Sequence, residues 1–406
     1  MIIIKKITFA GAYGINSIGD EAGAFFIANS LREIYNEKIF FSILDRHANL
    51  KQYEQYAFKS VQNLEYNSKE ESIGKWFRGF NYGDDKGVLI NIVKEIKNSD
   101  LLIIGLGNLL LDITIDLFRG PIPYYEVLSR IATLHEVPIM LYGLSIGPLS
   151  TEYGKLLTKS ILKQATIKTV RDKKSLALIK KLGINNSDVH LLPDPVVGIK
   201  ANKIDKSIKR KYIGVSVRSL AYKGDEELNK RYEKSILKIV QYFLGYLDFE
   251  VVFIPHCTYE FGGDEQNDII ISKRILEQLT NKDRASVLSK EKARSIPDVL
   301  NVYSKCAFSI STRLHSNIFA AITSTPMISI NYNPKVKGFI EWLGLQDYCL
   351  ELNDVDYSNL KEKVENLIGK IDIEREIIKN KILEGKEETD EYINLVVDIL
   401  EGATNI

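Results

Sequence analysis

The chain has 406 residues, of which 45% are hydrophobic and 26% charged, as in ordinary folded proteins. One hydrophobic core rarely organises so long a chain, so we expect two domains. The 54 basic and 53 acidic residues leave a net charge of +1, which argues against a nucleic-acid-binding protein, because such proteins carry a clear basic excess.

Three widely separated cysteines argue against a disulfide framework and fit a reducing compartment. Residues 1–7 lack the charge order and the cleavage site of a signal peptide. No stretch of sequence approaches the roughly 20 apolar residues that span a bilayer. We therefore expect a cytoplasmic protein, with peripheral contact at the inner face of the cell membrane left open.

The first half of the chain alternates short apolar runs with helical patterns. The predicted strands are residues 2–9, 39–44, 101–105, 138–142 and 167–170, and the predicted helices include residues 22–35, 124–135 and 173–182. Apolar runs of this length are typical of parallel strands buried on both faces. The alternation predicts βαβ units and a doubly wound sheet.

The pattern restarts after a Pro-Asp-Pro segment at 193–195 and a lysine-rich stretch. The second set of predicted strands is 212–218, 250–255, 308–311 and 327–331, with helices at 229–247, 264–279, 318–322 and 337–343. We therefore predict an α/β protein with an N-terminal domain (1–198), a linker (199–211), a C-terminal domain (212–370) and a helical tail (371–406) that returns towards the first domain. Residues 55–85 show no clear pattern. They form either a loop near the active site or a flap packed on the first domain.

Two glycine-rich segments follow predicted strands in the first domain, at residues 11–21 and 105–112. In an open α/β sheet, the loops at the carboxyl ends of the strands form the ligand crevice. The polar and glycine candidates for binding there are Asn16, Asp20, Gly107, Asn108 and Asp112. Asp20 and Asp112 are suited to sugar hydroxyls, but each also fits the N-cap of a helix.

Cationic residues stand at the ends of predicted strands in both domains. Arg171 ends the strand 167–170, and Arg218 ends the strand 212–218. Arg313 and His315 lie between a strand and an apolar helix, where the helix N-terminus favours anions, and Lys335 follows the next strand. Such a set predicts a site for a carboxylate or phosphate. The five histidines show no metal-ligand spacing, so we expect no metal.

The ordered set of motifs resembles the polysaccharide pyruvyltransferase family, most closely the branch that acts on secondary cell-wall polymers. The motifs lie at residues 13–21, 105–114, 124–125, 142–148, 170–175, 182–183, 193–195, 215–218, 311–316 and 332–335. The resemblance implies a glycosyltransferase-B-like fold with two Rossmann-like lobes. It also implies phosphoenolpyruvate as a co-substrate, no other cofactor, and a cyclic pyruvate ketal as the product.

By motif, the family's donor-binding residues match Arg171, His315 and Lys335, with Arg313 in the same motif as His315. From its place at a strand end, we expect Arg218 to be a further donor ligand. We expect His315 to act as a general acid, because an imidazole titrates near physiological pH. The acceptor is expected on the first domain as a lipid-linked or nucleotide-linked glycan. A nucleotide-sugar glycosyltransferase of the same fold and a non-catalytic sugar-binding protein remain alternatives, and the oligomeric state is open.

Overall fold

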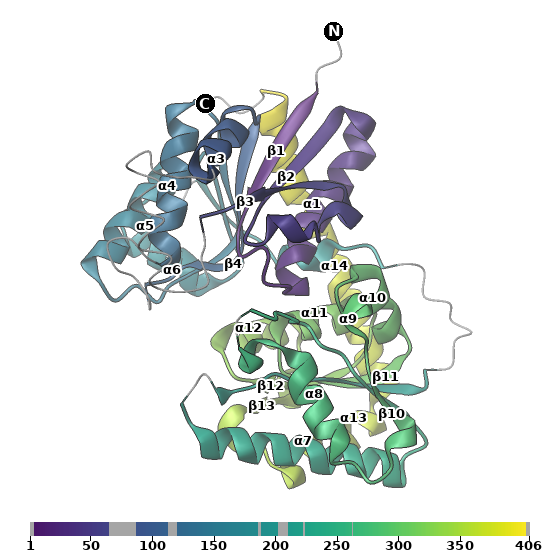
Figure 1. Ribbon diagram of the computed structural model, residues 1–406. Helices are drawn as coiled ribbons and strands as arrows, with labels where there is room; N and C mark the ends of the chain where they lie inside the picture. Colours follow the sequence, from purple (N-terminus) through teal and green to yellow (C-terminus); the bar gives the residue numbers. More distant parts are fainter. Residues whose placement is uncertain are drawn as a thin grey trace. The chain divides into compact units, whose positions relative to one another are not determined.

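The computed structural model describes residues 4–64, 87–112, 120–185, 188–201, 210–221, 224–261 and 263–402. The chain folds into two compact units, each built on one parallel sheet (Figure 1). Unit 1 comprises Met1–Ile15, Asp20–Pro195 and Glu388–Ile406, and unit 2 comprises Asn16–Gly19 and Val196–Glu387. Residues 65–86 and 202–209 lie outside the described residues, and with them most of the patternless segment and of the predicted linker.

The sheet of unit 1 has seven described strands in the order β3-β2-β1-β4-β5-β6-β7. Its three central strands are almost wholly buried, because helices cover both faces of the sheet. All neighbouring strands are parallel. The strands are β1 (Lys5–Ala10), β2 (Ile39–Asp45), β3 (Phe58–Gln62), β4 (Leu101–Leu110), β5 (Ile139–Ile146), β6 (Ile167–Val170) and β7 (Val189–Leu191).

Helices α3 (Val88–Lys97), α4 (Pro121–Leu134) and α5 (Glu152–Gln164) pack in succession and share one hydrophobic core with the sheet. Helix α1 (Ile18–Tyr35) and the C-terminal part of α14 (Ile371–Leu400) contact Tyr142 of β5. The Tyr142 hydroxyl donates to the carbonyl of Gly23, and its ring lies 5.0 Å from that of Tyr392. Helix α6 (Lys173–Lys181) begins at Asp172, whose carboxylate accepts from Ser175 N at 2.8 Å.

The sheet of unit 2 has the order β10-β9-β8-β11-β12-β13, again parallel throughout. Its described strands are β8 (Tyr212–Ser216), β9 (Glu250–Phe253), β10 (Ala285–Val287), β11 (Cys306–Ser311), β12 (Met327–Asn331) and β13 (Cys349–Glu351). Strands β8, β11 and β12 are neighbours, so their carboxyl ends meet at one edge of the sheet.

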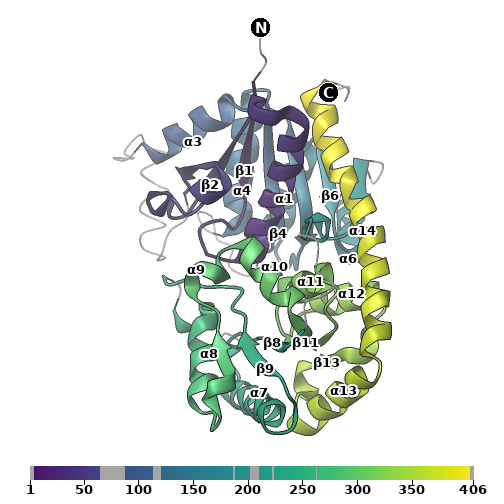
Figure 2. The ribbon, with the colours of Figure 1, turned by 90° about the vertical axis from the view of Figure 1, so that its right-hand side faces the viewer.

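Two groups of helices accompany this sheet. One consists of α7 (Glu226–Tyr246), α8 (Asp268–Glu277) and α13 (Tyr357–Gly369), and α7 contacts both of the others. The other consists of α9 (Lys290–Ala293), α10 (Ile296–Ser304), α11 (Leu314–Ile322) and α12 (Pro334–Leu343), which contact one another in that order. Helix α14 follows α13 and runs to the C-terminus, as its yellow ribbon in Figure 2 shows.

The predicted class, an α/β protein with two Rossmann-like sheets, is confirmed. The predicted glycine-rich turn at 105–112 is wrong for most of its length, because β4 continues to Leu110, with an irregular register against β5 between Gly107 and Leu110. No described helix is both long and apolar enough to cross a membrane.

Candidate functional site

Four of the predicted site residues lie at one edge of the unit 2 sheet. Arg218 lies two residues beyond β8, Arg313 and His315 follow β11, and Lys335 is in the first turn of α12 after β12. These strands are neighbours, so the fold brings the four side chains to the same edge. All four are partly exposed. The edge therefore presents cationic groups that a ligand can reach.

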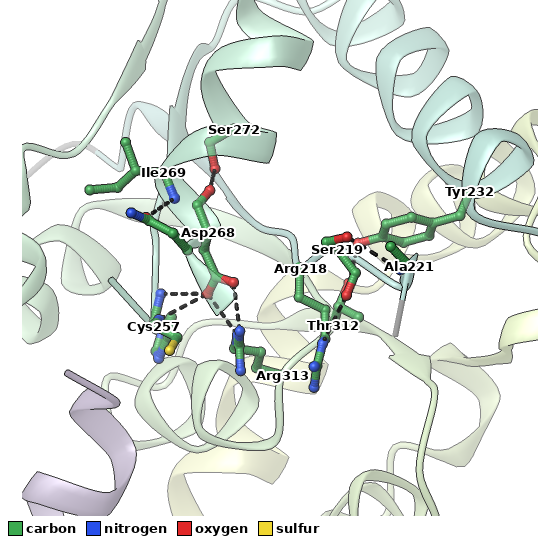
Figure 3. A network of polar contacts seen from close by, with 12 residues as sticks. Arg218, Ser219, Ala221, Tyr232, Cys257, Asp268, Ile269, Ser272, Thr312 and Arg313 are labelled. Carbon is green, nitrogen blue, oxygen red and sulfur yellow. Dashed lines mark hydrogen bonds and ion pairs between the residues drawn. The ribbon is translucent and has the colours of Figure 1, made fainter. Parts of the chain in front are cut away.

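Arg313 is held by a carboxylate that the sequence did not reveal. Its Nε and one Nη donate to the two carboxylate oxygens of Asp268, each at 2.6 Å (Figure 3). The Asp268 side chain is fully buried, and 17% of the Arg313 side chain is exposed. Burial disfavours the charged guanidinium, but Asp268 more than offsets this and raises the pKa of Arg313. The pair fixes the guanidinium in one orientation.

Asp268 is itself anchored by backbone groups. The carboxylate oxygen that accepts from Arg313 Nε also accepts from the amides of His256 at 3.1 Å and Cys257 at 2.9 Å. The Asp268 amide donates back to the Cys257 carbonyl at 2.8 Å. Burying a polar group is costly unless it is hydrogen-bonded, and these amides satisfy the buried carboxylate. The segment His256–Cys257 therefore sets the position of Arg313 through Asp268.

Tyr332 marks the convergence of the cations. The Arg218 guanidinium carbon lies 4.6 Å from the centroid of the Tyr332 ring, a cation–π contact. Burial raises the pKa of the Tyr332 phenol, but the charges of Lys335, Arg218 and Arg313 outweigh burial and lower the pKa below its ordinary value. Three cations thus act on one side chain, which is the electrostatic environment that an anionic ligand requires.

His315 is the second residue of α11, two residues beyond the extended N-cap Arg313. His256 lies behind the site, 3% exposed, with its Nε2 2.9 Å from the Tyr303 hydroxyl. Burial, then the charges of Arg313 and His315, hold the pKa of His256 well below its ordinary value of 6.5. His256 is therefore a neutral imidazole that packs beneath the charged groups.

Arg171 lies in unit 1 at the end of β6, whereas the other predicted donor ligands lie in unit 2. Its guanidinium pairs with the carboxylate of Asp194 and donates from Nε to Ser145 Oγ at 3.1 Å. Both side chains of the ion pair are at most 5% exposed. The predicted role of Arg171 at the donor stays a prediction.

The predicted acceptor residues divide between the two units. Asp20 and Gly107 are neighbours in unit 1, because a Cβ added to Gly107 would lie 3.2 Å from an Asp20 carboxylate oxygen. Asn108 donates to the Gly147 carbonyl at 2.9 Å. Asn16 belongs instead to unit 2, which corrects its predicted place on the first domain.

Asp112 accepts four hydrogen bonds from two residues before α5. They come from Ser150 N at 2.7 Å, Ser150 Oγ at 3.0 Å, Thr151 N at 2.6 Å and Thr151 Oγ1 at 2.9 Å. The structure therefore gives Asp112 a part in holding the start of that helix. A role of this residue or of the other candidates in binding an acceptor stays a prediction.

Sequence reasoning missed Asp268, Tyr332 and Asp194 as partners in these sites. Tyr332 and Asp194 lie inside motifs of the resemblance, so a closer reading of those motifs points to them. Asp268 lies 45 positions from Arg313 and carries no local signal. In the part of the chain that the structure describes, no three His, Cys, Asp or Glu side chains gather as a metal-binding group.

Comparison with solved structures defines the class of protein. UDP-GlcNAc 2-epimerase from Neisseria meningitidis matches with a TM-score of 0.59 and 13% identity, over 98% of this chain and all of that one. CalG4, the calicheamicin glycosyltransferase, matches with a TM-score of 0.54 and 10% identity, over 98% of each chain. At these identities the likeness shows the fold alone, and the chain is a glycosyltransferase-B-like, two-unit α/β protein.

The family follows from the sequence. Residues 18–334 match the profile described as "Polysaccharide pyruvyl transferase". The chain belongs to this family, and the predicted resemblance is confirmed. Amylovoran biosynthesis protein AmsJ from Erwinia amylovora is 24% identical over 280 residues, which are 65% of this chain. The match spans 66% of that relative, just under two thirds of its length.

Proposed function

We propose that this protein transfers a pyruvyl group from phosphoenolpyruvate to a sugar of a cell-wall or exopolysaccharide precursor. The product is a cyclic pyruvate ketal, and phosphate is released. Family membership supports a transferase that acts on polysaccharides. The observation that carries the donor assignment is the placement of Arg218, Arg313 and Lys335 at one edge of the unit 2 sheet, with Arg218 over the Tyr332 ring.

Phosphoenolpyruvate carries a carboxylate and a phosphate on one small molecule, so binding it needs several close positive charges. The carboxylate of Asp268 compensates the charge of Arg313. Arg218 and Lys335 therefore supply the net attraction. Arg313 supplies direction, because Asp268 holds its Nε and one Nη and so fixes the guanidinium in one orientation.

In the proposed reaction, His315 protonates the methylene carbon of the donor while a sugar hydroxyl attacks the adjacent carbon. The C–O bond between the donor carbon and the phosphate then breaks, and the phosphate leaves. A second sugar hydroxyl attacks the same carbon and closes the ketal. One hydroxyl proton replaces the proton that His315 gave, and the other leaves with the phosphate. His suits this task because its proton exchanges near physiological pH. No step in this scheme uses a metal ion, so we expect activity to survive EDTA.

The test is to incubate the protein with phosphoenolpyruvate and lipid-linked or nucleotide-linked disaccharides. Equal amounts of released phosphate and of pyruvylated glycan, seen by mass spectrometry, are expected. His315→Ala should lose about 10²–10⁴-fold in rate. Lys335→Ala should raise KM for phosphoenolpyruvate, whereas Lys337→Ala, whose ammonium pairs with Glu351 at 2.9 Å, is the matched control.

The rival activity is transfer of a sugar from a nucleotide donor, because the fold is shared with a glycosyltransferase. Thermal shift separates the two, since a ligand stabilises the folded state that binds it. Stabilisation by phosphoenolpyruvate and not by UDP- or GDP-sugars supports the proposal. Stabilisation by a nucleotide sugar alone, with no phosphate released from phosphoenolpyruvate, overturns it.

A further inference from the structure

The turn that follows β1 is attached to unit 2, although it precedes almost all of that unit in sequence. The carbonyl of Asn16 accepts from Thr258 N at 3.0 Å, and Ile18 N donates to the His256 carbonyl at 3.1 Å. Between them, Ser17 pairs with Cys257 in an antiparallel bridge. Residues 16–19 are thus fixed on the segment His256–Cys257.

Gly19, the second residue of α1, lies against the imidazole of His315. A Cβ built on Gly19 would lie 1.9 Å from Nδ1, 2.0 Å from Cγ and 2.6 Å from Cβ of His315. Carbon atoms that are not bonded come no closer than about 3.5 Å at their optimum. The backbone of Gly19 does not have a positive φ, so space, and not backbone conformation, requires glycine here.

The same short segment of unit 2 therefore controls both groups of the candidate site. His256 and Cys257 hold the Asp268 carboxylate that grips Arg313. Together with Thr258, they also hold residues 16–18, and the next residue, Gly19, lies against His315. Hydrogen bonds made by the backbone of residues 256–258 therefore set the position of the imidazole relative to the guanidinium.

We infer that Gly19 is a positioning residue for His315, so that residues 16–19 of unit 2 form part of the donor site of that unit. The inference rests on the proposed function for its effect on catalysis. Gly19 touches neither substrate nor reacting atoms. It acts by limiting where the imidazole lies, and a displacement of about 1 Å of a reacting group can cost about 10²-fold in rate.

The experiment compares Gly19→Ala with Gly245→Ala. Gly245 lies in α7 of the same unit, and a Cβ there meets nothing within 4 Å. Gly19→Ala should lower kcat about 10²-fold with little change in KM for phosphoenolpyruvate, because the cations of the site are untouched. Gly245→Ala should match the wild type. A Gly19→Ala variant with normal kcat overturns the inference.

A second measurement needs no activity. Replacing His315 with Gly removes all three atoms that the added methyl would meet, so Gly19→Ala should lower Tm in the wild type but much less in a His315→Gly background. Equal Tm losses in both backgrounds overturn the inference. If Gly19→Ala alone does not fold, recovery of folding in the double variant supports the inference, and failure to recover contradicts it. Absence of pyruvyl transfer by the wild type refutes the proposed function and leaves this stability cycle to decide the role of Gly19.

Discussion

Arg313 depends on a carboxylate from a different helix. The Asp268 side chain is fully buried, and breaking a buried ion pair from one side costs about 3–5 kcal/mol, since an uncompensated charge remains. We therefore expect Asp268→Asn to lower the free energy of unfolding by about that amount. The added amide would also face the guanidinium with its own donors. Chemical denaturation measures the loss, and exposed Asp264→Asn is the control. A variant as stable as the wild type contradicts the assignment.

His256 makes stability depend on pH. Its pKa in the folded protein lies well below the ordinary 6.5, because the ring is buried and faces the charges of Arg313 and His315. Below pH 6.5, His256 therefore binds a proton in the unfolded chain but stays neutral in the folded chain. Stability falls as pH decreases below this value, by up to about 1.4 kcal/mol for each pH unit.

Urea denaturation at pH 7.5 and pH 5 measures this effect against a His256→Gln variant, which carries no titratable group at this position. The variant should lose less stability between the two pH values than the wild type. The other histidines are the same in both proteins, so the difference isolates His256. Parallel losses would show that His256 is protonated in the folded state.

At the scale of elements, the long buried strands were predictable, and the short ones were not. Strands β4 and β5 have continuous apolar sequence because helices cover both faces. Strands β7 and β10 have three residues each, and these are partly or fully exposed, so they leave no apolar run to find. Helix α11 starts at Leu314, four residues before its predicted start, because extended Arg313 provides the N-cap.

The site was partly predictable for the same reason. Strand ends follow from the apolar pattern, which is why the four strand-end residues of unit 2 could be named from sequence. Contacts such as Arg313 with Asp268 join different elements, and no local pattern records them. The predicted turn at Gly107 and Asn108 failed because a glycine-rich sequence also suits an irregular strand.

Asp112 lies just beyond the irregular strand β4, and its substitution tests whether it stabilises the start of α5. Its carboxylate holds the start of α5 through hydrogen bonds from Ser150 and Thr151, and hydrogen bonds to a charged group contribute about 1.5–3 kcal/mol. Asp112→Ala should therefore lower the free energy of unfolding by about 2 kcal/mol. Glu152→Ala removes a carboxylate that is 90% exposed on the same helix and is the control. An equal effect of both substitutions contradicts the structural role.

At the scale of the whole molecule, chain order and spatial membership differ. Residues 16–19 belong to unit 2, and residues 388–406 belong to unit 1. Apolar periodicity reports that a helix such as α14 is buried along part of its length, but not which unit buries it. The predicted return of the helical tail towards the first domain anticipated the second exchange, whereas the predicted N-terminal domain (1–198) included residues 16–19.

A substitution of Tyr392 tests whether the C-terminal residues belong to unit 1. Its side chain is fully buried, its ring packs on Tyr142, and its hydroxyl donates to the Pro193 carbonyl at 2.9 Å. Truncation of a buried aromatic side chain costs about 3–5 kcal/mol. Tyr392→Ala should therefore destabilise unit 1, whereas Leu383→Ala, at a side chain 53% exposed on the same helix, should change stability by less than about 0.5 kcal/mol.

The two units need not unfold together, so a single melting temperature does not report where the damage lies. Hydrogen exchange of backbone amides does, because it measures local opening. In Tyr392→Ala, amides of β4 and β5 should exchange faster, while those of β11 and β12 keep their wild-type rates. Faster exchange in the second pair of strands, with the first pair unchanged, would place the end of α14 with unit 2. The selective result follows because Tyr392 contacts Tyr142 in β5 and Pro193, both residues of unit 1.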